Sequence, residues 1–287
     1  MKESIVMIKC TKIISLLLYA TISLASPKGH HALQSKTGNF ALPPSQQPGP
    51  LFGIGQNILD KGICQIGGFF VQEKGKAKNF VDLAPSILYG LTNQLSLLLT
   101  SPINLHHSPQ NRTNHGIQSI ITQLEYAFYK KEKPKSITCT TLLGNVMFPT
   151  TSSRRFGFLL GATLSHTAIN WYYFASPGAI FATQKHGAKD GNTYLFQCGV
   201  GRNIPSSPNI IALLMIELNS IFSQCDKSLG AKNPNSGGQV IYLGPTLWIS
   251  TKKIFIQGGI SFPIYEHLCG KQKKSDYLTV LNFGITL

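Results

Sequence analysis

The chain of 287 residues has a formal net charge of +15, yet only 13% of its residues are charged. Beyond the N-terminal segment no stretch reaches about 18 apolar residues, which excludes membrane-spanning helices, and the low charged fraction is unusual for a soluble protein. The length suits one large domain, and a mean hydropathy of +0.05 without hydrophobic helices is typical of a β-barrel, whose apolar residues alternate along strands.

Residues 1–25 have the pattern of a secretory signal peptide: lysines, a short apolar run over residues 13–22, and a small-residue end at Ala25. We expect cleavage after Ala25. An uncleaved anchor is the alternative, and Met7 is a second candidate start besides Met1. Loss of three lysines and one glutamate would lower the net charge from +15 to +13. That charge would suggest nucleic acid as a partner, but export argues against it.

Residues 26–60 are rich in Pro, Gly, Gln and Ser and show no sustained period. They are predicted to form an extended segment that lies in the periplasm or fills the barrel as a lumen plug. The pair His30-His31 is interpreted as solvated, since nothing nearby completes a metal site.

Residues 61–287 repeat with a period of two, which indicates strands. In the stretch 240–249, for example, Leu243 and Leu247 alternate with Tyr242 and Thr246. Twelve strands are predicted, over residues 61–72, 80–89, 95–105, 117–129, 137–148, 156–165, 169–182, 191–203, 210–224, 240–249, 254–265 and 277–287.

A final strand with one apolar face would promote aggregation unless its edge were paired, and closure into a barrel pairs it. In lipid, closed barrels are the only sheets without unpaired backbone groups. The fold class is therefore predicted as all-β, a single antiparallel up-and-down transmembrane β-barrel of about 12 strands over residues 61–287. An even strand number places both termini on one side, with short turns there and longer loops opposite.

Polar residues within the strands are predicted to face the lumen, because acids at mid-strand are costly unless they meet water or a partner. The candidates are Asp82, Gln123, Glu125, Glu217, Asn219 and Gln257. They could line a narrow channel or form a network that closes it.

The longer loops are rich in Lys and Arg, which indicates contact with anionic headgroups or capture of an anionic solute. The predicted lipopolysaccharide or anion contacts are Lys74, Lys76, Lys78, Arg154, Arg155, Lys271, Lys273 and Lys274.

The aromatic run from Trp171 to Phe174 is typical of a membrane interface, and burial in a core is the alternative. Five cysteines follow the cleavage point without a CxxC pair, so no metal or cofactor is expected. A disulfide between Cys225 and Cys269 is one hypothesis, since both border loops on the same side.

An enzyme is not expected. Ser165 and His166 are adjacent on a strand, so their side chains face opposite ways and cannot form a nucleophile and base pair. His115 and His186 lie in predicted loops without an evident acid to orient them.

Several stretches resemble the meta-pathway phenol-degradation family of outer-membrane β-barrel proteins. They are residues 85–95 (PSILYGLTNQL), Gly53-Ile54-Gly55, Gly244-Pro245 and residues 258–265 (GGISFPIY). The resemblance covers residues 49–287 and implies a twelve-stranded outer-membrane barrel that acts as a channel for hydrophobic or aromatic compounds. The family defines no catalytic residues. One departure is the last residue, Leu287, where such barrels usually end in Phe or Trp for the assembly machinery.

The expected function is a bacterial outer-membrane channel or transporter that passes small solutes, hydrophobic or aromatic ones included, through a narrow lumen. The alternative is a surface interaction, adhesion or structural protein with basic extracellular loops. The expected partners are outer-membrane lipid and lipopolysaccharide, the outer-membrane assembly machinery and a small solute.

Overall fold

The computed structural model describes residues 38–75, 78–108, 116–117, 119–150, 156–185, 187–204 and 207–287. Among these, the helices are two short 3-10 turns, Gly38–Phe40 and Pro44–Gln46, and neither is long or apolar enough to cross a membrane. The long strands are β1 Cys64–Gly75, β2 Lys78–Gly90, β3 Leu95–Thr100, β6 Ser119–Lys133, β7 Ser136–Pro149, β8 Gly157–Ala168, β9 Trp171–Ala182, β11 Thr193–Ile204, β12 Ile211–Ser223, β15 Gly238–Ser250, β16 Ile254–Leu268 and β17 Tyr277–Thr286.

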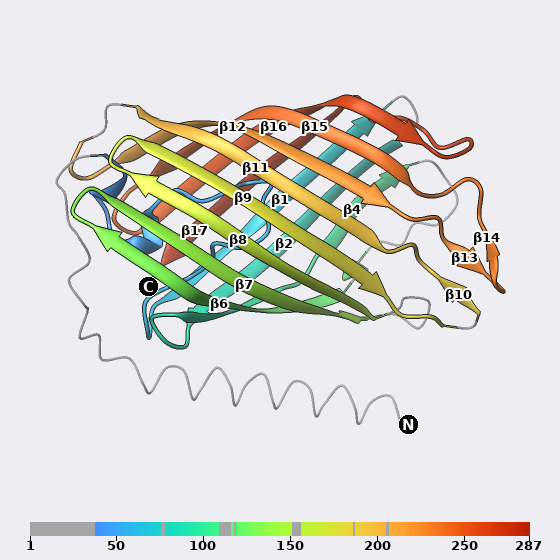
Figure 1. The fold of residues 1–287 in the computed structure, drawn as a ribbon, viewed down its shortest axis with the longest axis horizontal. Coiled ribbons are helices and arrows are strands. Elements are labelled where there is room, and N and C mark those ends of the chain that lie inside the picture. Colours follow the sequence, from blue (N-terminus) through green and yellow to red (C-terminus); the bar gives the residue numbers. More distant parts are fainter. Residues whose placement is uncertain are drawn as a thin grey trace.

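These twelve strands form one closed antiparallel ring (Figure 1). Each pairs with its neighbour in the chain, and β1 closes the ring by pairing with both β2 and β17. The last strand therefore has no free edge, which confirms the predicted barrel and its strand number. Two further short strands, β4 Ile103–Ser108 and β5 Gly116–Ile117, continue the sheet beside β2.

The third predicted strand, residues 95–105, is wrong as a single element. It breaks at Ser101-Pro102 into β3 and β4, and the register with β2 shifts between Val81 and Asp82. Proline has no N–H for the ladder, so a break at this point is expected on physical grounds. The first strand also begins later than predicted, at Cys64, and runs on to Gly75.

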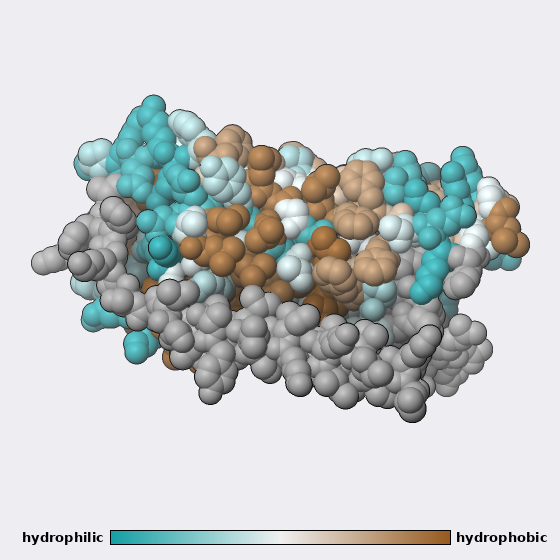
Figure 2. Space-filling model, turned by 90° about the horizontal axis from the view of Figure 1, so that it is seen from below, coloured by the Kyte–Doolittle hydropathy of each residue, from teal (hydrophilic) through white to brown (hydrophobic). Residues whose placement is uncertain are grey.

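The distribution of side chains is the reverse of that in a soluble protein. Along β12, Leu214 and Ile216 point outward and are 50% and 54% exposed, while Glu217, the residue after Ile216, is 1% exposed. The face shown in Figure 2 has apolar residues over the middle of the barrel and hydrophilic residues at both ends. A continuous exposed apolar belt is stable against hydrocarbon and not against water.

The predicted interfacial aromatic run is only half correct. Trp171 and Tyr173 point outward, where their rings stack at 6.1 Å between centroids. Tyr172 and Phe174 point inward and are buried in the barrel core. The period of a strand alternates the faces of neighbouring residues, so four consecutive aromatics cannot all meet lipid.

The two ends of the barrel differ. The connections 91–94, 134–135, 169–170 and 251–253 are short and lie at one end, called the short-turn end, together with the start of β1 and the end of β17. There the Leu287 N–H donates to the Cys64 carbonyl over 2.8 Å. The opposite, long-loop end carries the longer connections, including the small sheet of β10 Ala188–Lys189, β13 Lys227–Ser228 and β14 Ala231–Lys232.

Candidate functional site

The segment of residues 38–60 lies inside the barrel. It begins at the short-turn end, where the Asn39 N–H donates to the Ile169 carbonyl over 2.8 Å. It reaches the middle of the strands and then returns to the same end, where the Gly62 N–H donates to the Gly90 carbonyl over 2.9 Å before β1 starts. The segment thus enters and leaves through one mouth. The predicted signal peptide and residues 26–37 lie outside the described residues.

Glu217 of β12 holds the middle of this segment. The Leu51 N–H donates to both carboxylate oxygens, each at 3.1 Å, and the Phe52 N–H donates to Oε2 at 3.0 Å. Thr246 of β15 donates its hydroxyl to the same carboxylate over 2.7 Å. A buried carboxylate that receives several hydrogen bonds is a strong anchor, since bonds to a charged acceptor are about twice as strong as neutral ones.

Glu125 of β6 holds the second half in the same way. It accepts from the Gln56 N–H at 2.5 Å, from the Asn57 N–H at 3.0 Å and from the Thr141 hydroxyl at 2.6 Å. Gly55 and Gln56 both have positive φ, +88° and +64°, which turns the backbone so that consecutive N–H groups meet the carboxylate. A non-glycine residue with positive φ is uncommon, so the contacts around Gln56 must hold it there.

Neutral polar groups connect the segment to the wall between these two carboxylates. The Ile54 N–H donates to Gln197 Oε1 over 2.8 Å, and the Ile54 carbonyl accepts from the Thr163 hydroxyl at 2.6 Å. Gln257 Nε2 donates to the Gly49 carbonyl over 2.9 Å, and the Tyr172 hydroxyl donates to Gln56 Oε1. Satisfied backbone groups in a closed interior are necessary for such a segment, since each unpaired one would cost about 1–3 kcal/mol.

Apolar side chains fill the remaining contact area. Leu51 and Phe52 of the segment pack with Val280, Phe69, Val71 and Leu278 of β17 and β1. On the other side Leu42 belongs to a cluster of inner-face residues: Tyr172, Phe174, Ile211, Leu213, Met215, Trp248 and Phe255. The segment is therefore packed against the wall as well as hydrogen-bonded to it.

In the part of the chain that the structure describes, two small cavities of about 70 and 40 Å³ lie between the segment and the wall, lined among others by Asn57, Gln65 and Asn282. Since one water occupies about 30 Å³ in the liquid, the larger cavity has room for about two waters and the smaller for about one, and neither has room for an organic solute.

The six predicted lumen residues all lie on inner-face positions, but they do not form one cluster. Glu125, Glu217 and Gln257 bind the segment directly. Asn219 accepts a hydrogen bond over 3.2 Å from Gln197, which in turn binds the segment at Ile54. Gln123 is buried on the same wall. Asp82 lies nearer the long-loop end and accepts from Asn104 over 2.8 Å.

Several residues at the contact between the segment and the wall were not among the predicted ones: Asn39 and Gln46 of the segment, and Ser96, Thr141, Thr163, Tyr172, Gln197 and Thr246 of the wall. Most of them occupy inward positions of predicted strands, so the period of two could have found them.

Four of the predicted basic contacts lie exposed at the long-loop end: Lys74, Lys271, Lys273 and Lys274. They belong to neighbouring connections, since Lys74 of β1 pairs with Tyr277 just after the loop. Lys76, Arg154, Arg155 and the side chain of Lys78 lie outside the described residues.

The pair considered for enzyme chemistry separates as its spacing predicted. Ser165 points inward and donates to the Cys139 carbonyl at 3.4 Å, whereas His166 Nδ1 pairs with the Thr138 hydroxyl at 2.8 Å. His115 and His186 lie outside the described residues. Cys225 and Cys269 are free thiols in the structure, so the suggested disulfide is not formed there. Within the described ranges no group of three potential ligands could hold a metal ion.

Known structures with similar folds include two outer-membrane proteins. An outer-membrane channel from Pseudomonas putida F1 is 13% identical with a TM-score of 0.65, and the match covers 82% of this chain and 99% of the channel. The NanC porin is 12% identical with a TM-score of 0.51, covering 78% of this chain and all of the porin (100%). At these identities the likeness shows the fold. No protein-family model and no curated protein matches the sequence, so the resemblance to the phenol-degradation family stays a prediction.

Proposed function

We propose that the protein is an outer-membrane channel for small solutes whose lumen is closed by residues 38–60 and opens when this segment moves out. The observation that supports this most is the double anchor of the segment on Glu125 and Glu217. Both ends of the segment lie at the short-turn end, so it can withdraw without threading the barrel. The outer apolar belt and the fold shared with a channel and a porin support the membrane location.

The test is single-channel recording of the full-length protein in planar bilayers. Glu125→Gln combined with Glu217→Gln keeps the side-chain shape but removes the charge that receives the N–H groups, so we expect more frequent and larger openings than in the wild type. Glu132→Gln is the matched control, because Glu132 is exposed and pairs with Lys130 near the 134–135 turn. The channel would be refuted if neither the wild type nor the double variant conducted and if cells took up solute equally well with and without the protein.

Aromatic solutes fit the inner wall best. Trp248 and Phe255 stack face to face at 4.7 Å, and Tyr172 stacks on Phe174 at 5.9 Å, all beside the segment. Displacement of the segment would present these rings to a passing solute, and aromatic rings favour stacked partners. We expect benzoate to be more permeant than cyclohexanecarboxylate, measured as reversal potentials under bi-ionic conditions in the open double variant. Equal permeability of the two anions would refute the aromatic preference but not the proposed channel.

A surface interaction protein is the second candidate. The exposed lysines Lys74, Lys271, Lys273 and Lys274 at the long-loop end favour it, as does the position of residues 38–60 inside the barrel. Lipopolysaccharide is the anionic partner proposed for these lysines. Cells that express a variant with residues 269–276 shortened would then attach less to anionic surfaces, with solute uptake unchanged.

A further inference from the structure

The small sheet at the long-loop end brings three lysines into one row. β10, β13 and β14 project beyond the barrel wall (Figure 1). In their register Lys189 lies opposite Lys227, and Lys227 lies opposite Lys232. Directly opposed residues of an antiparallel sheet point to the same face, with Cβ atoms about 5 Å apart. The register thus places three ammonium side chains side by side.

Such a row is unfavourable by itself, because like charges directly opposite each other destabilise a sheet. Asp226, which precedes Lys227 in the chain, accepts a hydrogen bond from the Gly191 N–H over 2.8 Å. In the part of the chain that the structure describes, no ion pair joins any of the three lysines to a carboxylate.

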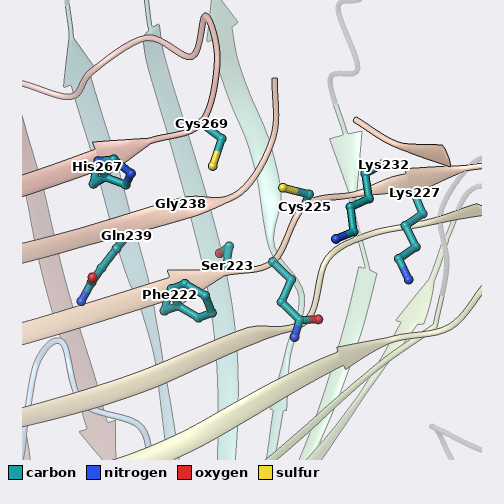
Figure 3. A pocket seen from close by; sticks show the side chains of 10 residues that line it. Phe222, Ser223, Cys225, Lys227, Lys232, Gly238, Gln239, His267 and Cys269 are labelled. Carbon is teal, nitrogen blue, oxygen red and sulfur yellow. The ribbon is translucent and has the colours of Figure 1, made fainter. Parts of the chain in front are cut away.

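A cavity of about 410 Å³ adjoins this row. Lys227 and Lys232 form one side of it, and their side chains extend in the same direction in Figure 3. The rest of the wall combines hydrogen-bonding groups with apolar ones: Ser223, Gln224, Gln239 and His267, and Phe222, Cys225 and Cys269. No carboxylate is among the described residues that line it. The cavity offers cations, amide donors and apolar contact area together.

We propose that the row Lys189, Lys227 and Lys232 and the adjoining cavity bind an organic phosphate. The phosphate oxygens would accept hydrogen bonds from the ammonium groups and offset their mutual repulsion, and the organic part would occupy the cavity against Phe222 and the glutamine amides. Ammonium groups bind phosphate as point charges, and bonds between two ionised groups are the strong ones. A free sugar phosphate and a phosphorylated lipid headgroup share this chemistry. The site lies at the end opposite the mouth that residues 38–60 use, so its occupancy does not depend on whether the barrel conducts.

The test is titration calorimetry on the full-length protein in a neutral detergent, with glucose 1-phosphate as the probe and glucose as its uncharged counterpart. We expect binding of the phosphate and none of glucose. Lys227→Gln with Lys232→Gln should weaken binding by about tenfold or more, because two charge-assisted contacts are lost. Lys252→Gln with Lys253→Gln removes the same charge from exposed positions in the 251–253 turn, at the opposite end of the barrel, and should change the affinity by less than about twofold, since charges far beyond a Debye length are screened.

Two further variants secure the interpretation. Lys189→Gln alone, outside the cavity but within the row, should weaken binding severalfold, and Lys227→Arg with Lys232→Arg should retain it. Absent binding of glucose 1-phosphate, or equal weakening by the two double glutamine variants, would overturn the site. Far-ultraviolet circular dichroism shows whether each variant keeps its β-structure.

Nanodiscs distinguish the two sources of the phosphate. Suppression of glucose 1-phosphate binding by lipopolysaccharide in the nanodisc, compared with discs of phosphatidylcholine, supports the site with a lipid headgroup as its occupant. Unchanged binding in both discs supports the site with a soluble phosphate.

Discussion

The backbone N–H of Leu51 donates to both carboxylate oxygens of Glu217, each at 3.1 Å, although the two residues are 166 positions apart. The Phe52 N–H and the Thr246 hydroxyl also donate hydrogen bonds to this carboxylate. This contact, with its counterpart at Glu125, fixes inside the barrel a segment whose regular structure is limited to two short 3-10 turns.

Glu217→Ala should therefore loosen the segment and destabilise the barrel by about 1–3 kcal/mol, since it leaves buried N–H groups without an acceptor. The temperature at which half of the protein shifts from the folded to the unfolded band on gels should fall. Protease added from the short-turn end should cut near residues 51–52. Glu132→Ala, at an exposed position, should change neither measurement. An uncut, equally stable Glu217→Ala protein would show that the carboxylate does not hold the segment.

Gly55→Ala should displace the turn at Glu125. A Cβ there would lie 2.6 Å from Leu143 Cδ2 and 2.7 Å from Thr163 Oγ1, and the φ of +88° is strained for alanine. We expect more frequent openings in planar bilayers than for the wild type.

Gly49→Ala is the matched control for this change. Gly49 belongs to the same segment, but nothing lies within 4 Å of a Cβ at that position. Equal behaviour of the two alanine variants would contradict the proposed tight seat of Gly55.

The outer apolar belt can be tested with Ile216→Arg, in the middle of β12, where the side chain is 54% exposed. An arginine at the midplane of the bilayer should destabilise the barrel by about 2–4 kcal/mol, measured by reversible unfolding in urea in lipid vesicles. Leu229→Arg provides the control, because Leu229 is 86% exposed in the loop between β13 and β14. The same loss of stability at both positions would mean that Ile216 does not face hydrocarbon.

Local pattern was sufficient for the wall and insufficient for what fills it. The period of two alone assigns Ile216 outward and Glu217 inward, because neighbouring strand residues must face opposite sides. The same rule should have separated Tyr172 from Trp171. The partner of Glu217 could not be predicted, because residues 38–60 have no period of their own and their positions follow from contacts distant in sequence.

The lysine row shows the same limit in another form. Lys189, Lys227 and Lys232 lie in three separate pieces of the loops, and only the register of β10, β13 and β14 places them side by side. Two-residue strands give no detectable alternation. Composition indicated a basic end of the barrel, but the arrangement of its charges follows from strand pairing.

Asn39 provides a last prediction, at the mouth through which the segment enters. Its side chain is fully buried, donates to the Ala168 and Trp171 carbonyls at 3.0 and 3.2 Å, and accepts from Asn203 Nδ2 at 2.9 Å. Asn39→Ala should lower the free energy of unfolding by about 1–3 kcal/mol, because it leaves buried polar groups without these bonds. Asn209→Ala, at an exposed asparagine in the turn before β12, should change it by less than about 0.5 kcal/mol.

A double-mutant cycle with Asn203→Ala isolates the bond between the two amides. We expect a coupling of about 0.5–3 kcal/mol in urea unfolding, as for residues that share one hydrogen-bond network. Additive effects of the two changes would show that the segment is held at this mouth by its backbone bond to Ile169 and not by the Asn39 side chain.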